Sequence, residues 1–446
     1  MHNFTAKNES SLQEVLEKFT TGKIISSILS DPRKFWIVFL ISYLTLVQIA
    51  ELPRSLNSEP HGDIKLYERV IRNIYNGQLP YKDFQLEYPP YAILFFILPS
   101  FFSTTRSFQT VFGVQILIAD ILVKFILLII ALKLLRLNKC SNQNSAENSE
   151  EELLPLSLFY PVLVFSLITA PNHYFYLQRY DLFPALISLL MLFFWLNGNY
   201  LLSGILLMFG AGIKLYPLLF LLPMLVASLR IKRHWHFITG LFIGALPLII
   251  LSFFMPWWKF MEFHAGRGLQ CESIWAGVVW LLKLCGVTNA NWTFTRAWVE
   301  VTGPLATSLL PYAKFFWLSL SAIAVIIASL RIWRSAEPAS FALLNNLLLG
   351  VLLIFVSFNI VLSPQYLIWI AVFTAISSIN RFSIYVALPV IAAIVTPILY
   401  PGLVYGSGFE MIETIVLFIR NGFLIFTGSY ILFNEAMKPL FKPSGS

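Results

Sequence analysis

The chain has 446 residues and a net charge of +8, with 57% of its residues hydrophobic and only 12% charged. A soluble domain carries roughly 25% charged residues, so this composition and a mean hydropathy of +0.73 exclude an ordinary soluble protein. The Lys and Arg residues stand in short clusters between apolar runs, which indicates membrane topology and excludes a nucleic-acid-binding surface.

The apolar runs predict an all-α polytopic membrane protein with about twelve transmembrane helices. A run of about 18 apolar residues can cross a hydrocarbon core of roughly 30 Å as a helix. We expect a cytoplasmic tail over residues 1–34, a single membrane domain over 35–433 and a second cytoplasmic tail over 434–446. The expected spans are Phe35–Leu52, Tyr88–Ser103, Phe108–Leu135, Leu153–Ala170, Leu182–Leu196, Leu201–Leu229, Phe237–Met255, Phe315–Leu330, Phe341–Leu362, Tyr366–Ser378, Phe382–Leu399 and Ile412–Phe433.

The basic residues predict that both termini lie in the cytoplasm, because Lys and Arg favour that side. The residues expected there are Arg33, Lys34, Arg106, Arg179, Arg230, Lys232, Arg233, Arg331, Arg334, Arg381, Lys438 and Lys442. The loop Ser363–Gln365, expected outside, has neither Lys nor Arg. One stretch disagrees with the scheme, because it puts Lys133, Arg136 and Lys139 outside.

Two segments on the expected outer side, residues 53–87 and 256–311, are long enough to hold a functional site. The second contains six Trp residues, which disordered segments lack and the membrane interface favours. We therefore expect both loops to fold against the membrane surface. Cys271 and Cys285 leave a disulfide in the second loop open, since spacing alone does not establish one.

In the first loop, the stretch from His61 to Gly77 predicts an amphipathic helix in the membrane interface, ended by Asn76-Gly77. The apolar residues that share one face are Ile64, Tyr67, Ile71, Ile74 and Tyr75. Asp63 stands where this helix begins, and two roles are open for it. Its carboxylate can cap the free N–H groups of the helix, or act as a catalytic base, or do both.

Short motifs follow one another in order between about Trp36 and Ile370. They are His61-Gly62-Asp63, Tyr67, Gly77, Pro80-Tyr81, Asp83-Phe84, Glu87-Tyr88-Pro89-Pro90, Arg179-Tyr180-Asp181, Pro184, Gly212, Lys214, Tyr216-Pro217, Arg267-Gly268-Leu269-Gln270, Glu272-Ser273, Ser363-Pro364-Gln365-Tyr366 and Trp369. The ordered set resembles glycosyltransferase family 87, the polyprenyl-phosphate-sugar-dependent mannosyl- and arabinosyltransferases of the GT-C superfamily.

The resemblance implies a GT-C-type helical bundle and an inverting transfer of a sugar, mannose by family habit, from a polyprenyl-phosphate donor on the outer face. The family's catalytic acid lies in the first outer loop, which implies Asp63 as general base. The matching Tyr67 is implied to contact substrate. Some relatives have His in the short loop where this chain has Gln365, so donor binding there departs from the family pattern.

This chemistry needs a carboxylate to take the hydroxyl proton and cations to hold the phosphate as its charge grows. Arg267 is the first candidate for the phosphate, with His264 or Gln270 in support, and an interfacial anchor is its alternative. Glu87 and Asp83 are acids that can bind acceptor hydroxyls, although capping or solvation in a loop accounts for them equally well.

Charged residues within the expected spans are further candidates, because a charge at the bilayer centre is costly. Asp120 and Lys124 stand four residues apart and can neutralise each other. Lys214 is equally a site residue or a structural ion pair with Asp181. For Arg420 a structural ion pair is favoured.

The expected partners are a lipid-linked sugar donor and a glycan or glycolipid acceptor, with no nucleic acid, metal or cofactor. The expected location is the plasma membrane of a bacterium. A secondary transporter is the alternative, since about twelve spans with both ends inside also suit a carrier. Carriers, however, are generally built from repeats with midplane sites, whereas this chain has no obvious repeat and gathers its polar residues in outer loops. A lipid-binding scaffold without catalysis is a third possibility.

Overall fold

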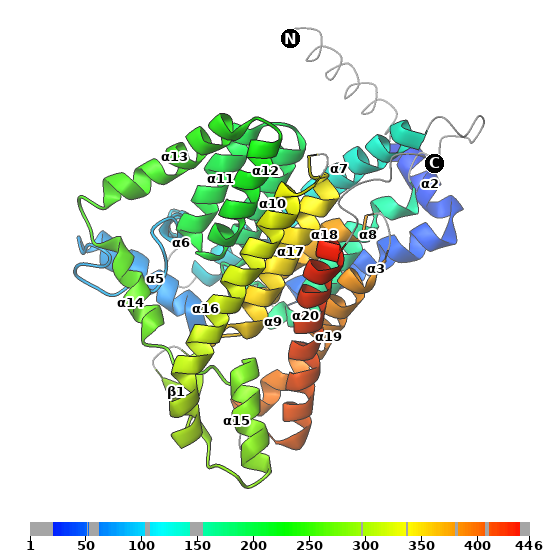
Figure 1. The fold of residues 1–446 in the computed structure, drawn as a ribbon. Helices are drawn as coiled ribbons and strands as arrows, with labels where there is room; N and C mark the ends of the chain where they lie inside the picture. The colour runs from blue at the N-terminus through cyan, green and yellow to red at the C-terminus, as the bar shows by residue number, and fades with distance from the viewer. Residues whose placement is uncertain are drawn as a thin grey trace.

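The computed structural model describes residues 21–50, 52, 62–102, 108–142, 155–295, 298–335, 338–379, 382–405 and 410–437. Residues 53–61, which include His61, and the basic residues Arg106, Arg381, Lys438 and Lys442 lie outside the described residues. The described chain is mostly helical (Figure 1).

The first half holds α2 (Thr21–Ser30), α3 (Pro32–Ile49), α5 (Gly62–Tyr75), α6 (Ala92–Ser100), α7 (Phe108–Asn142), η1 (Leu156–Leu158), α8 (Tyr160–Thr169), η2 (Ala170–Asn172), α9 (His173–Tyr176), α10 (Leu182–Leu196), α11 (Tyr200–Ile213), η3 (Tyr216–Phe220) and α12 (Leu221–Arg230). The second half holds α13 (His234–Leu251), η4 (Trp257–Lys259), α14 (Phe260–Ala265), α15 (Ile274–Leu284), β1 (Asn291–Thr295), β2 (Trp298–Thr302), α16 (Pro304–Trp333), α17 (Phe341–Phe358), α18 (Tyr366–Ser377), α19 (Ile384–Tyr405) and α20 (Met411–Met437). The strands β1 and β2 form an antiparallel hairpin.

Several helices indicate an integral membrane protein. Among the described residues, seven helical segments are long and apolar enough to cross a membrane, and six shorter apolar helices of 10–17 residues accompany them. The total of about twelve crossings, the interfacial position of the first-loop helix and the division into tails and one membrane domain stay predictions.

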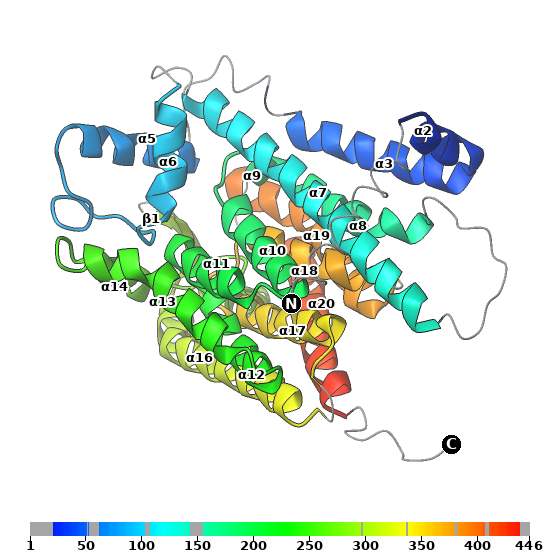
Figure 2. The same ribbon diagram turned by 90° about the horizontal axis from the view of Figure 1, so that it is seen from above.

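The centre of the bundle is formed by α17 and α18, with α3 and α7 on one side and α13 and α16 on the other (Figure 2). Every residue of α18 from Tyr366 to Ile376 is buried. A helix that is apolar on all its faces must be covered by protein or lipid, and here protein covers it. The cavity described below therefore borders on a helix fixed in the core.

Glycines bring α11 and α13 into close contact. A Cβ atom at Gly204 would meet the backbone of α13, and Cβ atoms at Gly240 and Gly244 would meet the backbone of α11. Such small residues let apolar helices approach closely where the hydrophobic effect gives little drive. Leu201 lies beside Gly240 and Ile205 beside Gly244, so the two helices run in the same direction.

The predicted single span Leu201–Leu229 is wrong, because the helix breaks at Lys214. The backbone of Lys214 is extended, with φ −156° and ψ 140°, and η3 begins two residues later. Pro217 explains the break, since it has no N–H to donate to the carbonyl of Ile213 and its ring disfavours a continuing helix. The charged side chain therefore stands at an open end of α11 and not in the middle of a helix.

The predicted span Tyr88–Ser103 is also wrong in length. Only Ala92–Ser100 form a regular helix there, and nine residues rise by about 14 Å at 1.5 Å each. Pro89 and Pro90 precede α6, and the hydroxyl of Ser100 at its end lies 2.7 Å from that of Tyr75 on α5. This helix is too short to cross a hydrocarbon core of roughly 30 Å.

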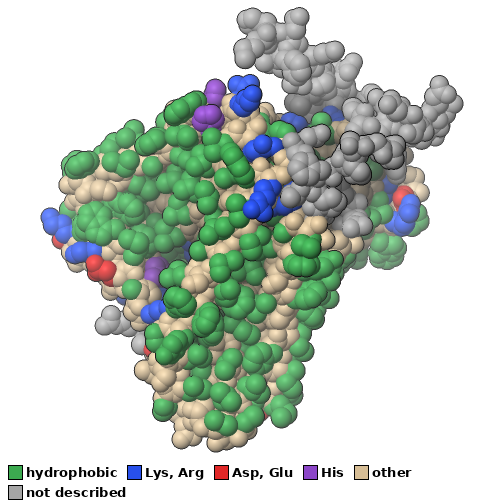
Figure 3. Space-filling model, in the orientation of Figure 1, with side chains coloured by type: hydrophobic (Ala, Val, Ile, Leu, Met, Phe, Trp, Pro, Cys, Tyr) green, Lys and Arg blue, Asp and Glu red, His purple; other side chains and the backbone are tan. Residues whose placement is uncertain are grey.

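Basic residues gather at one end of the bundle, over the ends of α12 and α16 at the upper edge of Figure 3. Arg230 donates to the carbonyl of Ser335 at 2.5 Å, and Arg331 to that of Glu435 at 2.5 Å. Lys133 joins the same end, because its ammonium donates to Asn197 at 2.7 Å in the turn before α11. The predicted position of Lys133 on the opposite side is therefore wrong.

The second outer segment is folded against the bundle, as its Trp residues predicted. The indole of Trp280 is buried and donates to the carbonyl of Cys271, and that of Trp275 donates to the carbonyl of Phe358 at 2.7 Å. Cys271 and Cys285 are both free, so they form no disulfide.

Candidate active site

A cavity of about 1420 Å³ opens between α5, the segment before α6, α14, the β-hairpin and the loop before α18. It collects side chains from both long outer segments and from the break after α11. Of the eight predicted site residues, the seven that line it are Asp63, Glu87, Lys214, His264, Arg267, Gln270 and Gln365.

Asp63 is the second residue of α5, and its carboxylate forms an ion pair with Arg179. The hydroxyl of Tyr88 lies 3.5 Å from the same carboxylate oxygen. Both charged side chains remain partly open to the cavity, at 15% and 22% exposed. Among the described residues no backbone N–H donates to Asp63, so capping receives no support and the carboxylate faces a cation in the cavity wall.

A second ion pair joins the two long outer segments. The Arg267 guanidinium lies 2.8 Å from the carboxylate of Glu87, 180 residues away in the chain. His264 contacts the main-chain carbonyl of Glu87 at 2.9 Å through Nε2. Because a carbonyl oxygen only accepts, Nε2 of His264 must carry the proton.

The ring of His264 is neutral at physiological pH. Although His264 lines the cavity and is exposed, the surrounding protein and then the charge of Arg267 lower its pKa to about 4. A neutral ring that donates from Nε2 keeps Nδ1 as an acceptor. His264 can therefore accept a hydroxyl hydrogen at neutral pH but adds no positive charge for a phosphate.

Lys214 is held in an aromatic cage. Its ammonium lies 2.5 Å from Asp181, whose same oxygen accepts the indole N–H of Trp369 at 2.8 Å. The ammonium also lies 4.8 Å from the ring centroids of Tyr180 and Trp369. The two alternatives for Lys214, a structural ion pair and a place in the site, are therefore compatible. It makes the expected ion pair with Asp181 and also lines the cavity.

Tyr67 and Asp83 differ from the other candidates because neither lines this cavity. Tyr67 is fully buried and stacks on Phe96 with ring centroids 4.2 Å apart. The carboxylate of Asp83 accepts the N–H of Leu79 at 2.7 Å and so closes a turn. Tyr67 therefore does not reach the cavity and its expected substrate contact stays a prediction, whereas capping accounts for Asp83.

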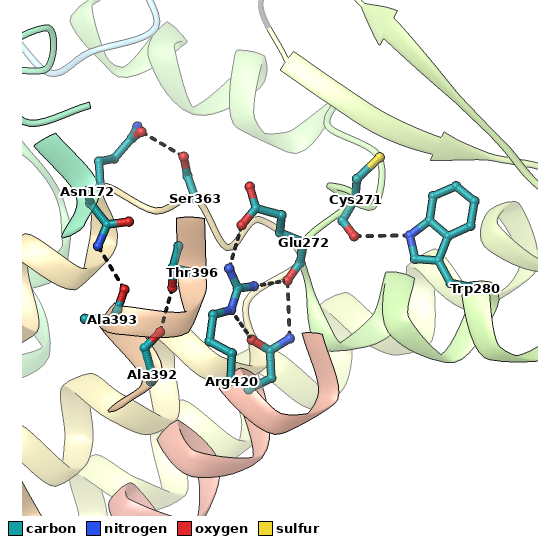
Figure 4. Close-up of polar contacts among 11 residues, drawn as sticks. Asn172, Cys271, Glu272, Trp280, Ser363, Ala392, Ala393, Thr396 and Arg420 are labelled. Carbon is teal, nitrogen blue, oxygen red and sulfur yellow. Dashed lines mark hydrogen bonds and ion pairs between the residues drawn. The ribbon is translucent and has the colours of Figure 1, made fainter. Parts of the chain in front are cut away.

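A buried charge pair forms another part of the cavity wall. Glu272 accepts from Arg420 of α20 at 2.5 Å, and Asn421 lies beside them (Figure 4). Arg420 therefore has the structural ion pair that the sequence favoured. The i,i+4 pair of Asp120 and Lys124 is formed as well, at 2.8 Å.

Sequence reasoning missed Arg179 as a site residue, because the charge pattern assigned it to the cytoplasmic side. Its guanidinium instead contacts Asp63 of the first outer segment, so the two residues do not lie on opposite sides as the charge pattern predicted. The motif Arg179-Tyr180-Asp181 was the available signal, since all three side chains lie at or behind the cavity wall. Within the described ranges, no three His, Cys, Asp or Glu side chains cluster as metal ligands would.

Comparison with known proteins adds a family to this geometry. The sequence pattern described as Glycosyltransferase family 87 matches residues 86–364, which is more than half of the chain. No curated protein matches the chain. Of the seven predicted site residues that line the cavity, five lie in the matched range, while Asp63 precedes it and Gln365 follows it.

Proposed function

Because the chain belongs to glycosyltransferase family 87, we propose that it transfers a sugar, mannose in the first instance, from a polyprenyl-phosphate donor to a glycan or glycolipid acceptor. The transfer takes place on the outer face of a bacterial plasma membrane, inverts the anomeric carbon and uses Asp63 as general base. Both termini of the chain lie in the cytoplasm.

The observation that carries this proposal is the meeting of Asp63 with cations from three other parts of the chain in one cavity. Asp63 lies at the wall together with Arg179, Lys214 and Arg267. A phosphate leaving group needs positive charge where its own charge develops, and a hydroxyl nucleophile needs a base. Arg is well suited to the phosphate, since its planar fork can donate two parallel hydrogen bonds.

The reaction proceeds as a single displacement. The acceptor oxygen attacks the anomeric carbon while the bond from that carbon to the phosphate oxygen breaks. Polyprenyl phosphate departs with the bonding electrons and remains next to the cations. The hydroxyl proton passes to Asp63, a step that typically contributes 10²–10⁴-fold to the rate.

The experiment compares membranes with and without the protein, supplied with labelled polyprenyl-phosphate sugars. Asp63→Asn keeps the size of the side chain but cannot accept the proton. We expect transfer to fall at least about a hundredfold at equal expression, the lower end of general-base effects. Near-normal transfer by this variant would remove Asp63 from the mechanism.

Asp83→Asn is the matched control. It makes the same chemical change in the same outer segment, and an Asn oxygen can still accept the N–H of Leu79. Since Asp83 does not line the large cavity, we expect this variant to transfer sugar at the rate of the unmodified protein. A melting temperature measured for both variants separates loss of chemistry from loss of folding.

A further inference from the structure

One part of the cavity wall carries polar side chains with hydrogen-bonding atoms that the ion pairs leave unused. It is formed by the segment Leu269–Glu272 and the chain that leaves α17, which are joined by a hydrogen bond of 2.9 Å from the N–H of Gln270 to the carbonyl of Ile360. The side chains that line the cavity here are Gln270, Glu272, Asn359 and Gln365.

The carboxylate of Glu272 is held in a fixed orientation. Arg420 donates through Nη1 to one carboxylate oxygen and through Nη2 to the carbonyl of Glu272, both at 2.5 Å. Its Nε donates to Asn421 at 3.0 Å. Figure 4 shows the second carboxylate oxygen of Glu272 pointing away from Arg420. Glu272 therefore offers an acceptor whose position is set by the core.

The neighbouring amides offer an acceptor and donors. The carboxamide oxygen of Gln270 is buried, and no described residue donates to it. The oxygen of Gln365 accepts from the hydroxyl of Ser363 at 2.7 Å, which directs its NH₂ group elsewhere. The oxygen of Asn359 accepts the N–H of Val361 at 3.0 Å, which likewise directs the NH₂ group of Asn359 elsewhere. A buried polar atom that lacks a partner costs free energy unless a ligand or water satisfies it.

We propose that Gln270, Glu272, Asn359 and Gln365 form a subsite for the hydroxyl groups of a neutral sugar ring. The proposal rests on the transferase function above and adds where a ring is held. A sugar hydroxyl both donates and accepts, so it suits a wall that mixes acceptors with amide donors.

A phosphate does not suit this wall. The carboxylate of Glu272 repels an anion, and the N–H groups of Arg420 that are oriented here already donate to Glu272 and Asn421. Lys214 and Arg267 at other parts of the cavity are the better partners for a phosphate. The phosphate of a lipid-linked substrate can thus lie against these cations while its sugar ring lies against the polar wall.

The first test measures binding directly. Methyl α-mannopyranoside and other methyl glycosides are added to the purified full chain, and saturation-transfer NMR reports contact with the sugar. We expect Gln270→Met to weaken glycoside binding about tenfold, or about 1.4 kcal/mol, while binding of undecaprenyl phosphate is unchanged. Gln78→Met is the matched control, because Gln78 is exposed outside the cavity, and it should bind as the unmodified chain does.

Glu272 needs a variant that leaves no unpaired buried charge, since removing one partner of such a pair is strongly destabilising. Glu272→Gln combined with Arg420→Met removes both charges. A purely structural pair predicts that this double variant binds glycosides normally once it folds, whereas a sugar subsite predicts weakened binding. Unchanged glycoside binding in Gln270→Met and in the folded double variant overturns the inference.

The transfer assay then shows whether the sugar ring in this subsite belongs to the donor or to the acceptor. A rise in the donor KM of Gln270→Met assigns the subsite to the sugar of the lipid-linked donor, and a rise in the acceptor KM assigns it to the acceptor glycan. If the unmodified chain binds methyl glycosides through these residues but transfers no polyprenyl-linked sugar, the transferase proposal fails and the subsite stands.

Discussion

Among single residues, Arg267 can separate substrate binding from chemistry. A guanidinium that grips a phosphate through two hydrogen bonds cannot be replaced by the single ammonium of Lys. We expect Arg267→Lys to raise the KM for the polyprenyl-phosphate donor about tenfold or more, with the acceptor KM unchanged. If Arg267 contacts only the charge that develops in the transition state, we expect kcat to fall and the donor KM to stay the same.

Steady-state kinetics with each substrate varied in turn check this prediction. Arg233→Lys is the control, because Arg233 is exposed at the basic end, directly before α13, and does not line the cavity. An Arg267→Lys variant whose single defect is in the acceptor KM would contradict contact with the donor phosphate.

His264 gives a prediction about pH and stability. Its pKa is about 4 in the folded chain, below the ordinary value of 6.5, because the surrounding protein and the charge of Arg267 disfavour the charged ring. Between these two values the unfolded chain binds a proton that the folded chain does not, so His264 lowers stability as the pH falls from about 6.5 toward 4.

His264→Gln removes this effect and keeps an amide donor for the carbonyl of Glu87. We expect the melting temperature of the unmodified chain to fall more between pH 7 and pH 5 than that of the variant. Thermal unfolding of both proteins in detergent at the two pH values measures the difference. Equal losses would mean that the ring is not held neutral by its surroundings.

At the scale of elements, the contact of Tyr91 at the start of α6 with Gly212 of α11 fixes the position of the helix break at Lys214. The N–H of Tyr91 donates to the carbonyl of Gly212 at 2.9 Å, and the Tyr91 hydroxyl donates to Gly244 on α13 at 2.9 Å. A Cβ atom at Gly212 would overlap the ring of Tyr91.

Gly212→Ala should therefore push Tyr91 away and disturb the segment of Lys214 two residues later. We expect transfer to fall about tenfold or more, since small displacements of positioning groups cost that much or more. Gly422→Ala is the control, because a Cβ atom there meets nothing within 4 Å. Activity measured at equal amounts of folded protein distinguishes the two; full activity in Gly212→Ala would show that the contact can relax.

Local signals predicted some elements well and others not. The end of α5 before Asn76-Gly77 is confirmed, because Gly77 adopts a φ of 81° that few other residues tolerate. The break in Leu201–Leu229 was missed, although Pro217 marks it, because a hydropathy run measures apolar length and not helix continuity. The fully buried face of Tyr67 could not be told from a substrate face, since both place an aromatic ring on one side of a helix.

At the scale of the whole molecule, the ion pair of Arg179 with Asp63 reverses part of the predicted topology. The sequence scheme put Gln178 inside and Asn197 outside. In the structure Gln178 lines the cavity next to Arg179, while Asn197 accepts from Lys133 at the basic end. The misassigned run Tyr88–Ser103 inverts only the spans up to Leu182–Leu196, because orientation alternates with each crossing and the break in Leu201–Leu229 restores the order after it.

Cysteine labelling tests this orientation in a background without native cysteines. With an impermeant maleimide applied to intact cells, we expect Gln178→Cys to react and Asn197→Cys to be protected. Ser363→Cys and Ser335→Cys serve as references, since both schemes agree on their sides. Reaction of Asn197→Cys with protection of Gln178→Cys would restore the order that the sequence predicted.

The residues of the site were easier to predict than their partners. Motif spacing selected Glu87 and Arg267 as separate polar residues, and the fold then brought both to the cavity, whereas the pair of Lys214 with Asp181 was foreseen. Contacts such as Glu87 with Arg267 span 180 residues, and no local pattern in the sequence encodes a pairing at that separation.

The paired charges of the cavity have a consequence for the order of events. The ion pairs join Arg179 to Asp63, Lys214 to Asp181 and Arg267 to Glu87. An anion that binds one of these cations competes with the carboxylate already paired with it, whereas water or a free alcohol has no charge with which to compete. If a donor phosphate draws Arg179 away, the same exchange leaves Asp63 without its counter-ion and open to a hydroxyl. Binding of the donor phosphate by Arg179 and release of Asp63 from its ion pair then occur together. We therefore expect the acceptor to bind after the donor.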